Sequence, residues 1–209
     1  MDTAKKLSVL RQLLIGKGYY RALRALEFAQ SYHTGIRKDG VTHEFDHQLS
    51  IALYVMTLPD LMYREATIAA VLLHDISEDY SVSRLEIINL FSTNDGEFAI
   101  LVADGVEHVT KKYRGRVKDE DVMFEAMAEH PISSIVKPAD RSHNFQTMIT
   151  VFDVPKQIGY IDFAEKRIFP MMKIARRKFP EQTMAYENMK HVLKGQIELI
   201  RAIHKAMGV

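Results

Sequence analysis

The sequence predicts an all-α protein, and three observations support this fold class. Apolar residues recur at spacings of three and four along most of the chain, which is the period of a helix with one buried face. Only ten glycines and six prolines interrupt the 209 residues. No run alternates polar and apolar residues long enough to indicate a confident strand, and a short β-ribbon is expected only near Arg37–Phe45. We expect one domain over residues 1–209, with a core at about 20–152 and a C-terminal helical extension at about 157–207.

The expected helices are recognised by this period and by their end signals. In chain order they are Tyr20–Tyr32, Asp46–Leu58, Glu65–Ile76, Ser83–Phe91, Glu97–Val109, Asp119–His130, Ile132–Phe152, Gly159–Phe179 and Glu181–Met207. Pro59 ends the second helix, because proline cannot continue the hydrogen-bond ladder. The third helix is apolar nearly all round, as a helix at the centre of the bundle would be. Ser83 begins the fourth helix, and Glu86 completes a capping box with it.

The composition limits the chemistry that the chain can perform. The 28 basic and 27 acidic residues leave a formal charge of +1, which does not favour a protein that coats DNA or an anionic membrane. A local basic patch remains possible. The absence of cysteine excludes disulfides, thiolate nucleophiles and thiolate zinc sites. Any metal ion must therefore be bound by histidine, carboxylate and water.

The chain shows no targeting or membrane-spanning segment. Met1–Leu10 carries three charged side chains and lacks the apolar stretch of a signal peptide. The longest apolar runs, Ile68–Leu73 and Phe98–Ala103, are about a third of the ~20 residues that span a bilayer. We therefore expect a soluble, cytoplasmic protein with no membrane partner.

The first motif with chemical potential is His74–Asp79. On one helix, His74 and Glu78 are four residues apart, as are Asp75 and Asp79, so all four side chains would project from one face. Three crowded carboxylates resist ionisation unless a cation neutralises them. Imidazole beside carboxylates suits manganese, iron, zinc or magnesium. The alternative interpretation is a solvated helix end with an incidental histidine.

Two further motifs are ambiguous when each is considered alone. Asp140, within Ala139–Asn144, follows an apolar-flanked run and could be half-buried, or could be a helix cap beside a surface arginine. The segment Arg37–Gly40 places an arginine and a lysine before a glycine turn, where they can reach a phosphate. A histidine that follows it, at the start of the next helix, could be a metal ligand or simply an exposed residue.

Taken in order, these motifs resemble the HD superfamily of metal-dependent phosphohydrolases, and within it the hydrolase domain of the RelA/SpoT alarmone enzymes and their small stand-alone relatives. The resemblance covers about Ala25–Thr147 and rests on four segments: His33–Gly40, Leu73–Asp79, Leu101–Val106 and Lys137–Asn144. It implies an all-helical domain that binds one divalent ion, commonly manganese. It further implies removal of pyrophosphate from the 3′ position of ppGpp, an activity of the stringent response. Iron, zinc, magnesium or cobalt would also suit the site.

Carried over position by position, the resemblance implies a role for each motif residue. The implied metal ligands are His47, His74, Asp75 and Asp140. Glu78 and Asp79 would orient or deprotonate the attacking water, and Asn144 would lie near the substrate sugar or phosphate. Arg37 and Lys38 would line the nucleotide pocket.

The chain departs from the family pattern in two places. One extra residue separates Gly40 from His47, and Thr42–Asp46 replaces the usual Pro-Tyr, so His43 is the fallback for His47 as ligand. Glu107–Val109 intervenes before the expected Thr-Lys, which bears on substrate identity.

The basic run Lys111–Lys118 has two interpretations. It is either a solvated loop or a clamp over the pocket, in which Lys112 and Arg114 bind substrate phosphates.

Other functions remain open at this point. The second enzyme hypothesis is an HD phosphohydrolase for another nucleotide, such as a dNTP, a nucleoside monophosphate or NADPH. An inactive nucleotide-binding regulatory domain is a third, although the retained Glu78–Asp79 pair argues against it. Nucleic-acid binding through Lys111–Lys118 is the least expected. The C-terminal helices could form a homo-oligomer contact, and no synthetase domain is expected after Val209.

Overall fold

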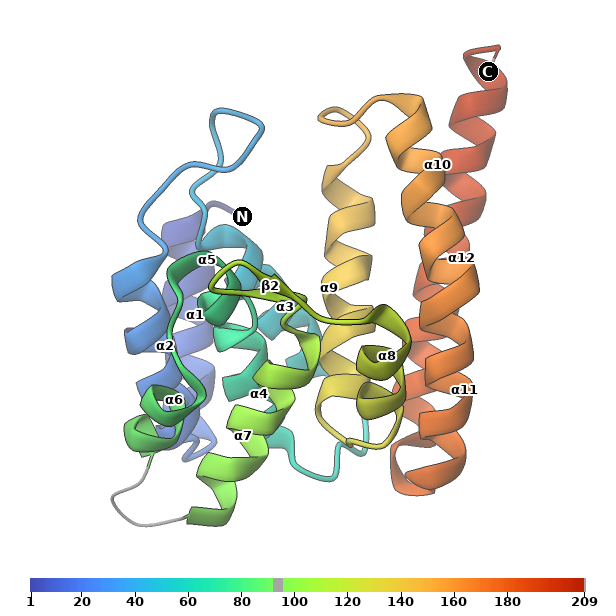
Figure 1. The fold of residues 1–209 in the computed structure, drawn as a ribbon. Coiled ribbons are helices and arrows are strands. Elements are labelled where there is room, and N and C mark those ends of the chain that lie inside the picture. The colour runs from blue at the N-terminus through green and yellow to red at the C-terminus, as the bar shows by residue number, and fades with distance from the viewer. Residues whose placement is uncertain (92–95, 209) are drawn as a thin grey trace.

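The fold is organised around α4 (Arg64–Leu73), which lies near the middle of the bundle (Figure 1). The computed structural model describes residues 1–91 and 96–208. Helix α4 contacts α2 (Tyr20–Tyr32), α3 (Asp46–Thr57), α7 (Gly96–Val109) and α9 (Ser133–Thr147). Its residues from Ala66 to Leu73 are all buried, as its uniformly apolar sequence predicts. The all-α fold class is therefore confirmed.

The remaining elements surround this centre. They are α1 (Thr3–Gly16), α5 (Ile76–Tyr80), α6 (Arg84–Phe91), β1 (Lys112–Tyr113), β2 (Arg116–Val117), α8 (Glu120–Ala128), α10 (Val154–Phe163), a π-helical segment (Ala164–Ile168), α11 (Phe169–Lys178), a 3₁₀ turn (Pro180–Gln182) and α12 (Thr183–Ala206). One hydrophobic core runs from Leu10 in α1 to Ile200 in α12. Within the described ranges, no helix is long and apolar enough to cross a membrane.

Helix α1 was not among the expected helices, yet it contributes to the hydrophobic core. Asp2 caps α1 by accepting the Lys5 N–H, and Leu10 and Leu14 are fully buried. Leu13 and Ile15 are exposed, so the apolar residues of this helix do not share one face and its period is blurred.

A network of polar contacts ties α1 to the start of α3. Lys6 Nζ lies 2.7 Å from Asp46 Oδ2, and the Thr3 hydroxyl donates to Asp46 Oδ1 at 3.0 Å. Burial opposes the charge on Asp46, but these partners outweigh it and lower the pKa of Asp46. The N-terminal helix is thus anchored beside His47.

The helices after Asp153 form two long antiparallel rods along one side of the bundle (Figure 1). The first rod begins at Val154, earlier than the expected Gly159, because Asp153 caps it and Pro155 occupies its first turn. Its π-helical segment ends at Ile168, two residues before Pro170, which has no N–H for an ordinary helical bond. The second rod, α12, packs on α9, where the Tyr186 and Ser134 hydroxyls are hydrogen-bonded at 2.8 Å.

The only regular sheet within residues 1–91 and 96–208 is a two-stranded hairpin in the basic run, β1 paired antiparallel with β2. Arg114 and Gly115 form its turn with φ values of 47° and 82°, the left-handed conformations that a tight hairpin needs. Strands of two residues are too short to show alternation in sequence. The ribbon expected at 37–45 is reduced to one antiparallel bridge between Ile36 and His43.

Two predicted helices have different ends in the structure. The expected Glu65–Ile76 stops at Leu73, and α5 begins separately at Ile76. The expected Ile132–Phe152 stops at Thr147, after which Phe152 N–H turns back to the Met148 carbonyl. The capping box of α6 is confirmed, because the Ser83 N–H donates to Glu86 Oε2 at 2.8 Å.

Candidate active site

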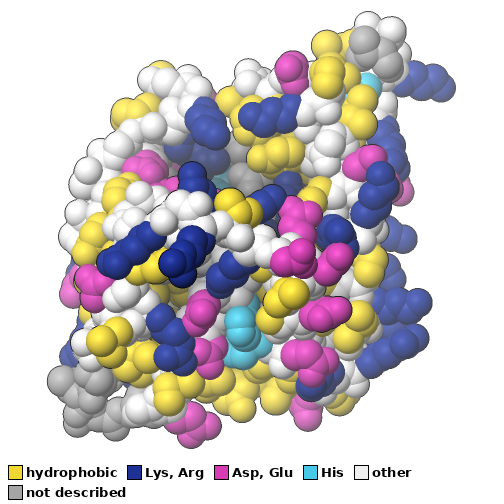
Figure 2. Space-filling model, viewed as in Figure 1, with side chains coloured by type: hydrophobic (Ala, Val, Ile, Leu, Met, Phe, Trp, Pro, Cys, Tyr) yellow, Lys and Arg dark blue, Asp and Glu magenta, His cyan; other side chains and the backbone are white. Residues whose placement is uncertain are grey.

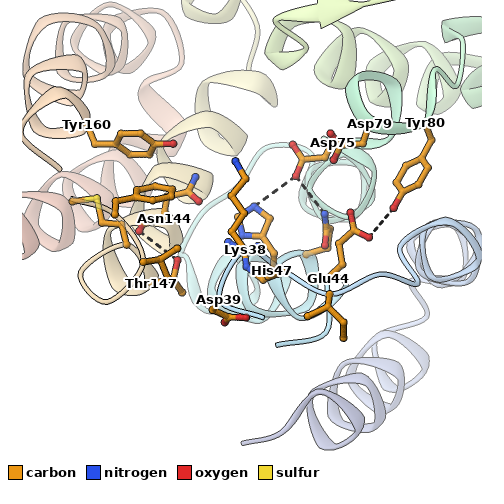
Figure 3. Close-up of a pocket in the computed structure, with 16 residues that line it drawn as sticks. Lys38, Asp39, Glu44, His47, Asp75, Asp79, Tyr80, Asn144, Thr147 and Tyr160 are labelled. Atoms are coloured by element: carbon orange, nitrogen blue, oxygen red, sulfur yellow. Dashed lines mark hydrogen bonds and ion pairs between the residues drawn. The ribbon is translucent and has the colours of Figure 1, made fainter. Parts of the chain in front are cut away.

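A cavity of about 490 Å³ opens where α3, α5, α9 and α10 meet the loop after α2, and Figure 3 shows its lining. Such a volume is typical of small-molecule sites. Glu44, Asp75, Asp79 and Tyr80 lie along one side of this view, and Asn144, Thr147 and Tyr160 lie along the other (Figure 3). On the molecular surface, Lys and Arg side chains gather around a hollow (Figure 2).

The helix break between α4 and α5 orients the His74 side chain. His74 Nδ1 lies 2.7 Å from the Val71 carbonyl, which can only accept, so Nδ1 carries the proton of this hydrogen bond. In the neutral ring, Nε2 therefore presents its lone pair. This nitrogen is buried and makes no hydrogen bond to any described residue. The break also means that His74, Asp75, Glu78 and Asp79 do not share one helix face, which corrects the expectation of a single helix.

Four of the predicted side chains converge at the base of the cavity. Asp75 Oδ2 lies 3.1 Å from His74 Nε2 and 3.7 Å from His47 Nε2. Asp140 Oδ1 lies 3.3 Å from His47 Nε2 and 3.9 Å from His74 Nε2. The structure thus brings together two imidazole nitrogens and two carboxylate oxygens from α3, the α4–α5 junction and α9. These are the donor atoms that divalent transition metals and zinc accept.

The charged groups of this cluster shift one another's pKa values. Burial opposes ionisation of Asp75 and Asp140, but His74 beside Asp75 and Lys137 beside Asp140 outweigh it and lower the pKa of both carboxyls. Burial also works against a charged His74, yet the two aspartates raise the pKa of His74 to about 9. The ionised aspartates therefore favour a proton on His74 Nε2, at the place where a divalent cation would bind. A cation would compete with that proton for the nitrogen lone pair.

His47 is oriented by a histidine that the sequence analysis did not assign to the site. His47 Nδ1 and His143 Nδ1 lie 2.8 Å apart, so one must donate and the other accept. Burial, followed by the neighbouring His47, lowers the pKa of His143 to about 3. Burial also lowers the pKa of His47, against the opposing Asp140. With both rings neutral, Nδ1–H of His47 can donate to His143 and leave Nε2 free for a ligand.

His47, and not the fallback His43, lies in this cluster. His43 is exposed, and its Nδ1 accepts the Phe45 N–H at 3.2 Å. His43 also forms the bridge with Ile36, so the extra residue of this loop is absorbed before α3 begins.

The other predicted residues divide between the cavity and its surroundings. Arg37, Lys38 and Asn144 line the cavity, and the Asn144 amide donates to Asp140 Oδ1 at 2.6 Å. Lys112 and Arg114 belong to the hairpin and are not among the described residues that line the cavity. Their assignment as substrate contacts stays a prediction.

The two acidic residues of α5 have different surroundings. Asp79 lines the cavity, where partial burial and the charges of Asp75, Glu44 and Glu78 raise the pKa of Asp79 to about 6. Glu78 Oε2 instead accepts the N–H groups of Lys111 and Lys112, at 3.0 and 3.3 Å, and so anchors the hairpin. This division was not visible while both residues were assigned to one helix face.

Several lining residues were missed because their sequence signals are weak. They include Glu44, Gln48, Tyr80, Thr147 and Tyr160. Gln48 donates to Asp75 Oδ2 at 3.3 Å. Its position next to His47 was the only available signal. Tyr160 lies in the C-terminal extension, which therefore contributes to the cavity.

Fold and site together define a class: an all-helical protein in which two histidines and two aspartates, distant in sequence, converge beside a small-molecule cavity. Over 128 residues, 60% of its length, the chain is 32% identical to a GTP pyrophosphokinase of Streptomyces coelicolor. Over 129 residues it is 32% identical to a GTP pyrophosphokinase rsh of Brucella melitensis. Over 130 residues it is 33% identical to a protein of Synechocystis named "Probable guanosine-3′,5′-bis(diphosphate) 3′-pyrophosphohydrolase".

These similarities concern a part of much longer proteins. The matched region covers 14% of the Streptomyces protein and 16% of the other two. No protein-family model matches the chain. The names agree with the resemblance to alarmone enzymes, whereas membership of the HD superfamily stays a prediction.

Proposed function

We propose that this chain is a metal-dependent phosphohydrolase that removes the 3′-pyrophosphate of guanosine 3′,5′-bis(diphosphate) and related alarmones. The observation that carries the proposal is the convergence of His47, His74, Asp75 and Asp140 beside the cavity. Similarity to proteins named for GTP pyrophosphokinase and for 3′-pyrophosphohydrolase activity, over 60% of the chain, supports a guanosine polyphosphate as the substrate.

The donor set fits a divalent cation such as manganese. His74 Nε2 is buried, is aimed at two carboxylates and has its lone pair set by the bond from Nδ1 to Val71. His47 is held in the same way through His143. A cation bound by these residues would supply Lewis-acid polarisation of a phosphoryl group and of the attacking water.

The imidazole content of the cluster favours hydrolysis over pyrophosphate transfer from ATP. Magnesium sites for nucleoside triphosphates use carboxylates, waters and phosphate oxygens. Here two of the four donors are histidine nitrogens, which suit manganese, iron, cobalt or zinc better than magnesium.

Asp79 is the side chain best placed to accept the proton of the attacking water. It lines the cavity and, with a pKa of about 6, is mostly ionised at neutral pH while remaining basic enough to take a proton. Glu78 is occupied by two backbone N–H groups of the hairpin, so we assign it a positioning role.

The phosphates of the substrate would be bound by the cations of the loop after α2. Arg37 and Lys38 line the cavity and offer charge-assisted hydrogen bonds to phosphate oxygens. Asn144 donates a hydrogen bond to Asp140 and lies across the cavity from Glu44 and Asp79 (Figure 3). From there it can contact the sugar or a phosphate.

The deciding experiment incubates the manganese-loaded chain with ppGpp, a panel of dNTPs, nucleoside monophosphates and NADPH, and with GTP plus ATP. We expect release of pyrophosphate from ppGpp, abolished by a chelator and restored by manganese. Cleavage of another nucleotide alone would replace the alarmone with that substrate, and nucleotide binding without turnover would favour a regulatory domain. Full activity in demonstrably metal-free protein would refute the metallohydrolase proposal.

A matched pair of arginine variants tests the phosphate contact. Arg37→Ala should raise KM at least tenfold with bound metal unchanged, because a charged hydrogen bond outside the metal cluster is lost. Arg177→Ala removes an exposed arginine from α11 and should leave KM unchanged. Equal KM values in the two variants would show that the phosphates do not contact Arg37.

A further inference from the structure

A second group of possible metal ligands lies beside the first. His33, Glu44 and Asp79 each offer a nitrogen or oxygen atom, and these atoms lie within 4.8 Å of one another. They come from three elements, since His33 follows the last turn of α2, Glu44 precedes α3 and Asp79 belongs to α5. None of the three belongs to the cluster of His47, His74, Asp75 and Asp140.

His33 is the buried side chain of this group whose ring nitrogens lack hydrogen bonds. It is 0% exposed, and neither of its ring nitrogens makes a hydrogen bond to any residue in the described part of the chain. The ring is fixed between Phe45, stacked at 6.1 Å, and Tyr80, edge-on at 5.0 Å. A buried imidazole without a hydrogen bond loses the bonds that water gave it in the unfolded chain, so such groups normally have a ligand.

Glu44 is oriented toward His33 by its own hydrogen bonds. Its Oε2 accepts the Tyr80 hydroxyl at 2.8 Å and the Gly35 N–H at 3.2 Å. Its other oxygen, Oε1, lies 3.4 Å from His33 Nδ1, at ion-pair distance but without hydrogen-bond geometry. One carboxylate oxygen is therefore held by the protein, and the other is directed into the group.

The group opens to the cavity, so a cation can reach it. Glu44 and Asp79 line the cavity beside Asp75, and Figure 3 shows these carboxylates on the same side. Three carboxylates on one wall concentrate negative charge, which a divalent cation would neutralise. One imidazole and two carboxylates are a donor set for manganese, iron or zinc.

We propose that His33, Glu44 and Asp79 form a second divalent-cation site, which makes the cavity a two-metal centre. The proposal concerns cation binding, and only its use in catalysis rests on the proposed function. There, a second cation would bind phosphate oxygens that the first does not reach. A carboxylate that binds a cation through one oxygen keeps the other free, so Asp79 can still accept a proton.

Metal stoichiometry of the full chain tests this site. The chain is stripped with a chelator and titrated with Mn²⁺ by calorimetry, and bound metal is measured by elemental analysis. We expect two equivalents in the unchanged protein, one in Glu44→Gln and one in Asp140→Asn, which lacks a ligand of the first cluster. Glu198→Gln, a change at an exposed glutamate of α12, is the matched control and should retain both.

The outcomes separate the two proposals. One equivalent in the unchanged protein that survives Glu44→Gln and is lost in Asp140→Asn would overturn the second site and leave the proposed function intact. Two equivalents in Glu44→Gln would place the second ion elsewhere and overturn the assignment. Binding unaffected by Asp140→Asn would instead contradict the first cluster.

A second variant guards against misfolding. If circular dichroism shows that Glu44→Gln is unfolded, His33→Gln serves in its place and should also bind one equivalent. Manganese electron paramagnetic resonance gives an independent readout, because two neighbouring ions broaden each other's spectrum. The broadening should disappear in Glu44→Gln or His33→Gln, and its persistence would overturn the proposal.

Discussion

Acid should destabilise this protein through a histidine outside the candidate active site, His130. Burial, followed by the neighbouring His108, lowers the pKa of His130 from 6.5 to about 4. Its Nδ1 accepts the Ser133 N–H at 3.3 Å, and the His108 ring packs against it edge-on at 5.0 Å. Protonation of Nδ1 would break the hydrogen bond at the start of α9, so the folded chain favours the neutral ring.

The size of the effect follows from the two pKa values. Because the folded-state pKa is depressed, the unfolded chain binds more protons below pH 6.5. Stability is therefore lost as the pH falls from 6.5 toward about 4. Linkage over this shift gives a loss of about 2 kcal/mol in the free energy of unfolding between roughly pH 7.5 and pH 5.

The measurement compares unchanged protein with His130→Asn by urea denaturation at both pH values, in chelator so that metal binding does not contribute. Asparagine keeps an oxygen that can accept the Ser133 N–H but cannot be protonated in this range. The loss of stability on acidification should be smaller in the variant by about 2 kcal/mol. An identical loss in both proteins would refute a neutral, buried His130.

Three further outcomes are expected. Asp79→Asn should retain the cation of the cluster of His47, His74, Asp75 and Asp140, lose on the order of a hundredfold or more in kcat and lack the acidic limb of the pH–rate profile, whereas Glu78→Gln should lose less. This limb falls at or below about pH 6, because a bound cation lowers the pKa of Asp79 further. In chemical denaturation, Gly105→Ala should destabilise by about 1 kcal/mol, because the new methyl lies 2.8 Å from the stiff Ile132 side chain and the strain exceeds the helix-propensity gain. Gly195→Ala, which meets nothing within 4 Å, should stabilise by up to about 1 kcal/mol. Calorimetric scans should show a lower unfolding temperature after chelation and its recovery with manganese; an unchanged temperature would contradict metal binding to the folded state.

The sequence predicted the features that depend on local pattern. The all-apolar run of α4 and the Ser83–Glu86 box have their origin within a few residues, and both are confirmed. The break at His74–Asp75 was not predictable in this way, because the segment contains neither glycine nor proline. Its shape depends on where the His74 ring and the Asp75 carboxylate find their partners.

The site shows the same division between local and long-range signals. The ordered motifs identified His47, His74, Asp75 and Asp140 as candidate ligands, and the structure brings these four side chains together. The residues that support them were missed because their partners are distant in sequence, as with the 96 positions between His47 and His143. Likewise, the role of Glu78 depends on a hairpin that is more than 30 residues away and whose strands are too short to recognise.

The bonds between α1 and Asp46 have a practical consequence for handling the protein. Lys6 neutralises the Asp46 carboxylate, whose side chain is only 11% exposed, and Thr3 donates a hydrogen bond to it; the next residue is His47. A bulky fusion partner or a proteolytic cut before residue 6 would disturb these contacts, and a single peptide bond separates Asp46 from the candidate metal ligand His47. The far end of α12 projects from the body of the molecule (Figure 1). An affinity tag therefore belongs at the C-terminus if activity and metal content are to be measured on undisturbed protein.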